Sequence, residues 1–119
     1  MSTLSTHVLD TSMGMPARGV RVQLHAAPSP TASPAPTQPV EPLGEGVTDD
    51  DGRVATIGPD HLEAGTYRLT IYSGAYFATT GRTSFYPEVV IVVTVADPDE
   101  HYHVPVLLNP FGYTTYRGS

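Results

Sequence analysis

The sequence predicts an all-β fold, a sandwich or a barrel of about eight short strands with one short helix. Apolar residues alternate with polar ones in several short segments, which is the period of a strand with one buried face. Clusters of glycine, aspartate, asparagine and proline separate these segments and predict turns between them. Many short alternating strands at regular spacing favour a sandwich or a barrel.

The strand signal is clearest in the middle and at the end of the chain. In residues 20–25, Val20, Val22 and Leu24 alternate with polar neighbours, and residues 67–72 show the same pattern. The β-branched run at residues 88–96 predicts a strand buried on both faces. Together with weaker candidates, the chain contains about eight strands, at residues 4–9, 20–25, 43–48, 53–57, 67–72, 88–96, 101–108 and 111–117.

One short helix is expected near Ser73 to Thr80. Ser73 is a candidate for its N-terminal cap, because a serine hydroxyl can accept a hydrogen bond from a free backbone N–H. Gly81 is a candidate for its C-terminal end, because glycine adopts the left-handed conformation that terminates many helices.

A length of 119 residues predicts a single domain spanning residues 1–119. Residues 26–42 differ from the rest, because half of the twelve prolines fall there. This composition predicts an extended surface loop inserted between two strands. A docking segment for an aromatic groove is the alternative, and ordinary loop behaviour favours the plain insertion.

Composition argues against several classes of function. The net charge is −6, and the six basic residues are scattered arginines, so we expect no nucleic-acid partner. The chain has no cysteine, which rules out disulfides and thiolate chemistry. The longest apolar run, Val89 to Val93, is too short to cross a bilayer. The first residues lack the pattern of a signal peptide, so we expect a cytoplasmic protein without membrane contact.

Four places in the chain carry residues suited to hydrolysis. His7 and His103 lie on the outward faces of predicted strands, Arg53 follows a predicted turn, and Tyr116-Arg117-Gly118-Ser119 closes the sequence. Imidazole exchanges protons near neutral pH, and a guanidinium holds carbonyl or anionic groups. Ser119 adds a hydroxyl and, as the last residue, a carboxylate. Taken singly, each residue is more often a solvated side chain than a functional one.

Other assignments for these groups have less support. His101 shares a face with His103 and could pair with it on a metal, but zinc needs further ligands that no motif supplies, so we expect no metal and no cofactor. His25 and His61 are expected at the surface. Ser119 as a covalent nucleophile ranks below activation of water, because a terminal residue must be held by neighbours to attack reproducibly.

Four blocks of sequence, in order, resemble the 5-hydroxyisourate hydrolases, the transthyretin-related enzymes of urate breakdown. These blocks cover nearly the whole chain apart from the proline-rich loop. They are LSTHVLDTSMGMPARGVRVQL (4–24), TDDDGRV (48–54), YFATTGRTSFYPEVVI (76–91) and HYHVPVLLNPFGYTTYRGS (101–119).

The resemblance implies a transthyretin-like sandwich of two four-stranded sheets with one short helix. It implies an enzyme that hydrolyses the N1–C6 amide bond of 5-hydroxyisourate to 2-oxo-4-hydroxy-4-carboxy-5-ureidoimidazoline. It also implies a homotetramer, a dimer of dimers, whose sites line a channel between facing subunits. His7, Arg53, His103 and Ser119 are then the expected catalytic residues. The substrate-binding residues would be His7, Arg53, Tyr116, Arg117 and Gly118.

Two other functional classes stay open at this point. Transthyretin shares the fold and is a hormone carrier, so the fold alone does not decide function. The polar set of histidines, Arg53 and the Tyr-Arg-Gly-Ser ending favours the enzyme over the carrier. A structural or adhesive sandwich would leave these outward side chains without a role.

Overall fold

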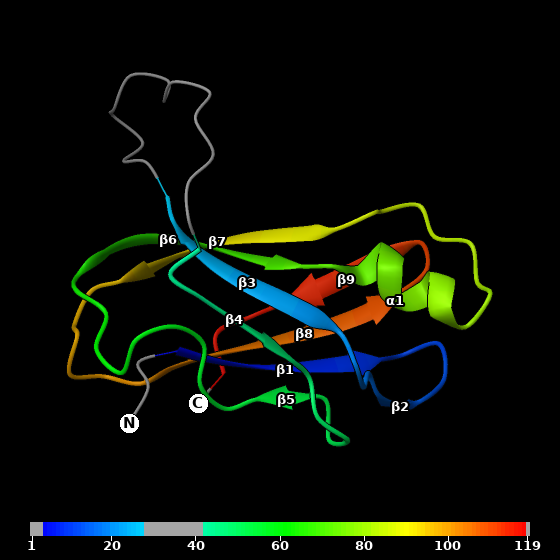
Figure 1. The fold of residues 1–119 in the computed structure, drawn as a ribbon, viewed down its shortest axis with the longest axis horizontal. Helices are drawn as coiled ribbons and strands as arrows, with labels where there is room; N and C mark the ends of the chain where they lie inside the picture. Colours follow the sequence, from blue (N-terminus) through cyan, green and yellow to red (C-terminus); the bar gives the residue numbers. More distant parts are fainter. Residues whose placement is uncertain (1–3, 28–41, 119) are drawn as a thin grey trace.

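The strands form two sheets that pack face to face in the computed structural model, which describes residues 4–27 and 42–118 (Figure 1). The first sheet contains β1 (Leu4–Asp10), β2 (Met15–Pro16), β5 (Arg53–Val54), β8 (Tyr102–Asn109) and β9 (Gly112–Thr115). The second sheet contains β3 (Arg21–Ala26), β4 (Gly44–Val47), β6 (Gly65–Ile71) and β7 (Val89–Val95). The helix α1 (Ser73–Thr79) follows β6, at the end of the sandwich away from the start of β1.

The predicted sandwich with one short helix is confirmed, with one change in the strand count. The second sheet has four strands in the order β4-β3-β6-β7, as expected. The first has five, because two strands of two residues each share one edge of β1. Of these, β5 pairs with Thr6 and His7, and β2 pairs with Leu9 and Asp10. The sequence did not predict β2, since two residues are too few to show a period.

The core lies between the two sheets and is made by alternate residues of the strands. The alternations predicted for residues 20–25, 67–72 and 101–108 are confirmed, because the apolar residues predicted for the inward face of each segment are buried. The inward-facing side chains with almost no exposure include Leu4, Val8, Val22, Leu24, Leu69, Ile71, Val106 and Leu108. The intervening residues therefore point away from the core, and on the first sheet these are the candidate site residues.

The prediction that residues 88–96 are buried on both faces is wrong. Val89 and Val95 are buried in the core, whereas Val90 and Val92 are 41% and 58% exposed. β7 is an edge strand whose only described strand partner is β6, and no other described element covers its outer face. A run of β-branched residues shows strand propensity but does not show whether a second layer covers the strand.

The helix ends as expected but begins differently. Ser73 is the first residue of α1, Tyr72 precedes it, and no side chain caps the start. The Ser73 hydroxyl donates to the Tyr86 carbonyl instead. At the other end Gly81 has φ 70°, and its N–H and that of Arg82 donate to carbonyl groups of the last helical turn. This is the glycine-terminated arrangement that the sequence predicted.

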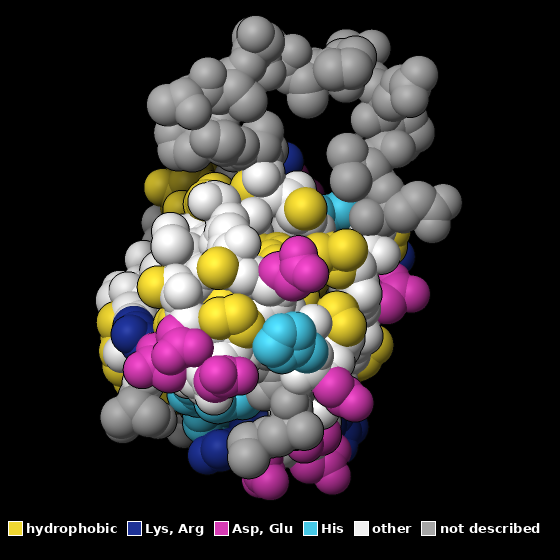
Figure 2. Space-filling view, turned by 90° about the vertical axis from the view of Figure 1, so that its left-hand side faces the viewer, with side chains coloured by type: hydrophobic (Ala, Val, Ile, Leu, Met, Phe, Trp, Pro, Cys, Tyr) yellow, Lys and Arg dark blue, Asp and Glu magenta, His cyan; other side chains and the backbone are white. Residues whose placement is uncertain are grey.

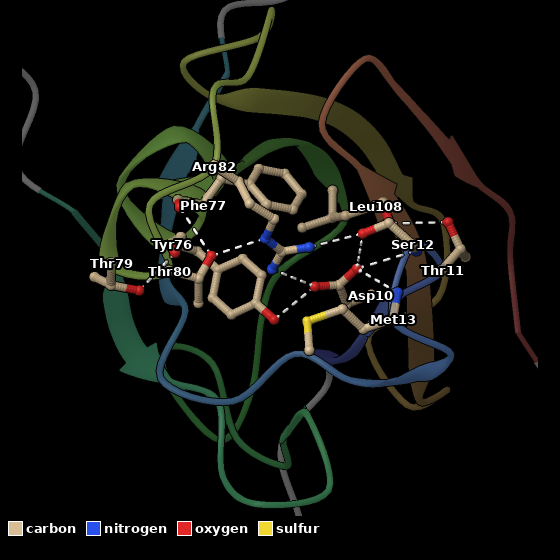
Figure 3. Close-up of polar contacts among 10 residues, drawn as sticks. All are labelled: Asp10, Thr11, Ser12, Met13, Tyr76, Phe77, Thr79, Thr80, Arg82 and Leu108. Carbon is tan, nitrogen blue, oxygen red and sulfur yellow. Dashed lines mark hydrogen bonds and ion pairs between the residues drawn. The ribbon is translucent and has the colours of Figure 1, made fainter.

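A buried carboxylate ties the end of β1 to the helix (Figure 3). Asp10 accepts hydrogen bonds from the Ser12 hydroxyl at 2.6 Å and from the Tyr76 hydroxyl at 2.8 Å. Arg82, just after the helix, donates to the same carboxylate at 2.8 Å and lies over the Phe77 ring. Burial alone would raise the pKa of Asp10, but the hydrogen bonds from Arg82, Ser12 and Tyr76 outweigh it and lower the pKa to about 2.

Most of the proline-rich loop predicted at residues 26–42 falls at 28–41, outside the described residues. Its neighbours belong to the second sheet, since β3 ends at Ala26 and β4 begins at Gly44. Among the described residues, no helix is long and apolar enough to cross a membrane.

Candidate active site

Three strands of the first sheet bring the predicted site residues to one face. β1 runs parallel to β8 and pairs Ser5 with His103, while β5 runs antiparallel to β1 and pairs His7 with Arg53. Side chains alternate across a strand, so the outward residues of β1 lie beside the outward residues of both neighbours. Residues separated by almost the whole chain therefore meet on the outer face, as the fold family led us to expect.

The turn before β5 determines where Arg53 begins its strand. One carboxylate oxygen of Asp49 accepts the backbone N–H groups of Asp51 and Arg53, at 2.9 and 3.0 Å. Gly52 has φ 77°, a conformation that glycine adopts without strain, so the chain can reverse there. The hydrogen bond from the Arg53 backbone lowers the pKa of Asp49, which keeps this carboxylate ionised as an acceptor. The predicted Asp-Gly-Arg turn is confirmed.

His7 is held by the same turn. Its Nε2 atom lies 2.9 Å from the carbonyl oxygen of Asp51. A carbonyl only accepts, so the neutral ring carries its proton on Nε2 and leaves Nδ1 as the basic nitrogen. The ring centroids of His7 and His103 are 6.4 Å apart, so the two imidazoles are neighbours on this face.

His103 lies between β1 and the C-terminal tail. Its Nδ1 atom is 2.8 Å from the Ser5 hydroxyl, and the same hydroxyl is 2.8 Å from Nε2 of His101. Burial lowers the pKa of His103, and electrostatic repulsion from the neighbouring basic groups His7, Arg53 and His101 lowers it further. The imidazole of His103 is therefore neutral at neutral pH, which is the form that can accept a proton.

Arg53 and His103 line an open pocket of about 470 Å³ on the outer face of the sheet, and His7 lies beside it, paired with Arg53. Its walls are Ser5, Thr6, Arg53, Val54, Ala55, His101 and His103. A space of this size suits a small heterocycle. Among the described residues, no group of three or more histidine, aspartate or glutamate side chains is arranged to hold a metal ion.

The surface at the end of the sandwich where β1 begins carries several acidic side chains among apolar ones. Figure 2 looks at this end and shows acidic side chains across it, with arginine and histidine surface near its lower edge. The chain as a whole has a net charge of −6. Within the pocket, the guanidinium of Arg53 provides a local positive charge. Such a charge suits a carbonyl oxygen or an anionic ring.

The C-terminal tail contacts the site through Gly118 and not through Arg117. The Gly118 N–H donates to the His103 carbonyl at 2.8 Å, and a β-carbon at Gly118 would lie 2.7 Å from Cδ2 of His103. Arg117 lies over the Tyr102 ring, which faces the opposite side of the sheet, and pairs with Glu100.

Tyr116 and Arg117, both predicted to bind substrate, do not line the pocket that contains Arg53 and His103. Tyr116 and Arg117 line a separate cavity of about 300 Å³ between the edges of the two sheets, together with Tyr102. Ser119, predicted as a catalytic residue, lies outside the described residues. The sequence missed Ser5, although its position two residues before His7 places both on one face of a strand.

Comparison with known proteins agrees with the fold. The model of the HIUase/Transthyretin family matches residues 4–118. The chain belongs to the HIUase/transthyretin family. A relative from Schizosaccharomyces pombe, named a probable 5-hydroxyisourate hydrolase, is 43% identical over 118 residues, which are 98% of this chain and 90% of the relative.

Two solved structures represent the two branches of the family. The 5-hydroxyisourate hydrolase of Klebsiella pneumoniae superposes with a TM-score of 0.82 at 42% identity, covering 100% of this chain and 94% of that one. The transthyretin of Sparus aurata superposes equally well, with a TM-score of 0.84, but at 26% identity, covering 99% and 97%. The fold is common to both branches, whereas sequence identity is higher with the hydrolase.

Proposed function

We propose that this protein hydrolyses 5-hydroxyisourate at the N1–C6 bond, producing 2-oxo-4-hydroxy-4-carboxy-5-ureidoimidazoline in urate degradation. The observation that carries the proposal is the pocket in which Arg53 meets His103, with His7 paired to Arg53 on the neighbouring strand. Identity of 40–43% to relatives named as 5-hydroxyisourate hydrolases, over nearly the whole chain, supports the same reaction.

His103 is the proposed general base. Its Nδ1 atom faces Ser5 on one neighbouring strand and its Cδ2 atom faces Gly118 on the other side, so Nε2 lies at the outer edge of the ring. A water molecule at that edge would lose a proton to Nε2 while its oxygen attacks the C6 carbonyl. The neutral ring required for this step is favoured by burial and by the neighbouring basic groups, which lower the pKa of His103.

Arg53 is the proposed stabiliser of the charge that develops on the carbonyl oxygen. Attack by water converts the C6 carbonyl into a tetrahedral oxyanion, and a fixed guanidinium near that oxygen lowers the barrier. The Asp49 carboxylate holds the backbone N–H of Arg53, so the start of β5 is fixed before substrate binds.

His7 is the proposed partner for the substrate on the other side of the pocket. Its Nε2–H is engaged by the Asp51 carbonyl, so Nδ1 is left to accept a hydrogen bond from a ring N–H of the substrate or from the water.

When the tetrahedral intermediate collapses, the C6–N1 bond breaks and N1 receives the proton held by His103. The new carboxylic acid then ionises and releases one proton to solvent.

The tail is proposed to act as a wall beside His103. Gly118 closes against the ring, and Arg117 anchors the tail from the opposite face through Tyr102 and Glu100. For Tyr116 and Ser119 the proposal rests on the resemblance alone, which assigns them to substrate binding and catalysis. Removal of residues 116–119 is therefore expected to abolish turnover and leave a folded sandwich.

A homotetramer with sites between subunits, located in the cytoplasm, is part of the proposal. Support for assembly comes from the open face of the pocket and from family members of similar fold. Sedimentation of the purified protein tests the tetramer, and imaging of a fluorescent fusion tests the compartment. A fully active monomer would contradict a site shared between subunits.

The decisive experiment generates 5-hydroxyisourate with urate oxidase and follows its ultraviolet decay. The protein is expected to accelerate the decay, and His103→Ala or Arg53→Ala is expected to lower turnover about a hundredfold or more. His25→Ala, on the outer face of the other sheet, is the matched control and should keep full activity. An unaltered spontaneous decay would favour a carrier, and a fully active His103→Ala would remove the proposed base.

A further inference from the structure

The hydroxyl of Ser5 lies between the imidazole rings of two histidines. Its hydroxyl is 2.8 Å from Nδ1 of His103 and 2.8 Å from Nε2 of His101, and the serine itself is only 7% exposed. The strand register explains this, because Ser5 pairs directly with His103 and His101 lies two residues earlier on the same face. The three side chains form a short hydrogen-bonded chain along the wall of the pocket.

A serine hydroxyl has one proton and two lone pairs, so Ser5 donates in at most one of the two contacts. In the first arrangement His103 donates from Nδ1–H to Ser5, and Ser5 donates to Nε2 of His101. In the second arrangement Ser5 donates to Nδ1 of His103, and His101 donates to Ser5. In the third arrangement both imidazoles donate to Ser5. The first and the third leave Nε2 of His103 with a free lone pair, and the second places a proton there.

We infer that Ser5 and His101 are positioning residues that hold His103 in the Nδ1–H tautomer, with Nε2 free to act as the base. This inference rests on the proposed hydrolysis, in which Nε2 of His103 removes a proton from water. The second arrangement prevents that step, because a nitrogen that already carries a proton accepts no other in the neutral ring. The first arrangement excludes the second, because donation to His101 uses the only proton of Ser5. A partner that fixes the tautomer of a catalytic histidine is a recurring requirement of such sites.

His101 is essential to this arrangement although it does not touch His103 in the hydrogen-bonded chain. With an acceptor at His101, the serine proton points away from His103. Without that acceptor the hydroxyl can turn and donate to Nδ1 of His103, which moves the imidazole proton to Nε2. Loss of His101 is therefore expected to deactivate the base while the Ser5–His103 contact persists.

The groups around His103 favour a neutral ring in each arrangement. His7 faces it from β1, Arg53 from β5 and His101 from the position just before β8, and all three disfavour a second proton. Gly118, which faces it from the tail, carries no charge. The arrangements therefore differ in which nitrogen of the His103 ring holds its single proton.

The test uses the full-length protein with isotope-labelled histidine and long-range proton–nitrogen NMR, which distinguishes the two tautomers directly. The expected result is the Nδ1–H form of His103 in the unaltered protein. His101→Leu and Ser5→Ala should each shift it toward the Nε2–H form, and His101→Gln, whose amide oxygen can accept from Ser5, should keep the Nδ1–H form. An Nε2–H tautomer in the unaltered protein, or an unchanged tautomer in both His101→Leu and Ser5→Ala, would overturn the inference.

Turnover supplies the second readout. His101→Leu should lower kcat about tenfold to a hundredfold, the range typical for partners that orient a functional histidine, with little change in KM. His101→Gln should recover a substantial part of that loss, which a general packing role would not produce. Since His101 is exposed, these variants are expected to fold even if Ser5→Ala does not. Equal losses in His101→Leu and His101→Gln would contradict the inference.

The outcome for the proposed function is separate. If the unaltered protein leaves the decay of 5-hydroxyisourate unchanged, the proposed reaction fails, whatever the tautomer of His103. If the reaction is present and the tautomer is Nε2–H, only the assignment of Ser5 and His101 fails.

Discussion

Replacing Asp10 with asparagine removes one negative charge from a buried site and changes little else in shape. The carboxylate has no exposed surface and receives hydrogen bonds from Ser12, Tyr76 and Arg82 (Figure 3). In Asp10→Asn the amide keeps one oxygen as an acceptor but presents a donor where the carboxylate accepted. Arg82, which is 23% exposed, then lacks its counter-charge.

The size of the effect follows from the pKa of Asp10. Burial opposes ionisation, but the hydrogen bonds and the charge of Arg82 lower the pKa from 3.8 to about 2. That difference corresponds to about 2 kcal/mol of folding free energy at neutral pH. Leaving the Arg82 guanidinium partly unpaired adds to the cost, so we expect Asp10→Asn to lower the free energy of unfolding by about 2 to 4 kcal/mol.

The pH dependence has a definite sign. A carboxyl whose native pKa is lowered stabilises the fold above its unfolded pKa, 3.8, and loses that contribution as pH falls toward about 2. The difference in stability between the unaltered protein and Asp10→Asn should therefore be full at neutral pH and shrink below pH 3.8. Urea unfolding at several pH values and one protein concentration measures it.

Asp50→Asn is the matched control, because Asp50 forms an ion pair with Arg18 in which both side chains are largely exposed. Exposed pairs contribute little, so this variant should unfold like the unaltered protein. Equal stability of Asp10→Asn and the unaltered protein at neutral pH would refute the reasoning. A difference that stays constant down to pH 2 would refute the assignment to ionisation of Asp10.

Three further predictions concern the turn, the tail and the base. Gly52→Ala should lower the free energy of unfolding by about 1 to 3 kcal/mol, because the residue has φ 77° and the new methyl group would meet the Val8 carbonyl. Gly14→Ala is the control, since Gly14 has a similar φ of 66° but no neighbour within 4 Å, and it should lower that free energy less. Gly118→Ala should lower kcat with little change in stability, because the new β-carbon would lie 2.7 Å from the His103 ring. Full activity of this variant would show that the tail does not close on that ring. The acid limb of kcat/KM should lie below pH 6.5, because burial and neighbouring basic groups lower the pKa of His103. Activity should therefore persist at neutral pH and fall only in more acidic solution. An acid limb at or above pH 6.5 would contradict this assignment.

Local patterns were sufficient for most of the fold. Alternation predicted the strands that build the core, and the glycine at position 81 correctly marked the end of the helix. Alternation also placed His7 and His103 on outward faces, because the side-chain period of a strand is a local property. The two failures have different causes. Whether a second layer covers β7 depends on residues that are distant in the sequence, whereas β2 has two residues, too few to show a period.

The candidate site shows the same division. The sequence by itself determined which residues have the right chemistry and, through resemblance, which family to compare. Only the tertiary structure decided that Ser5 joins His101 to His103, because that contact follows from the parallel register of β1 and β8. It also decided that Arg117 faces away from the histidines, since successive residues of the tail point to opposite sides of the sheet.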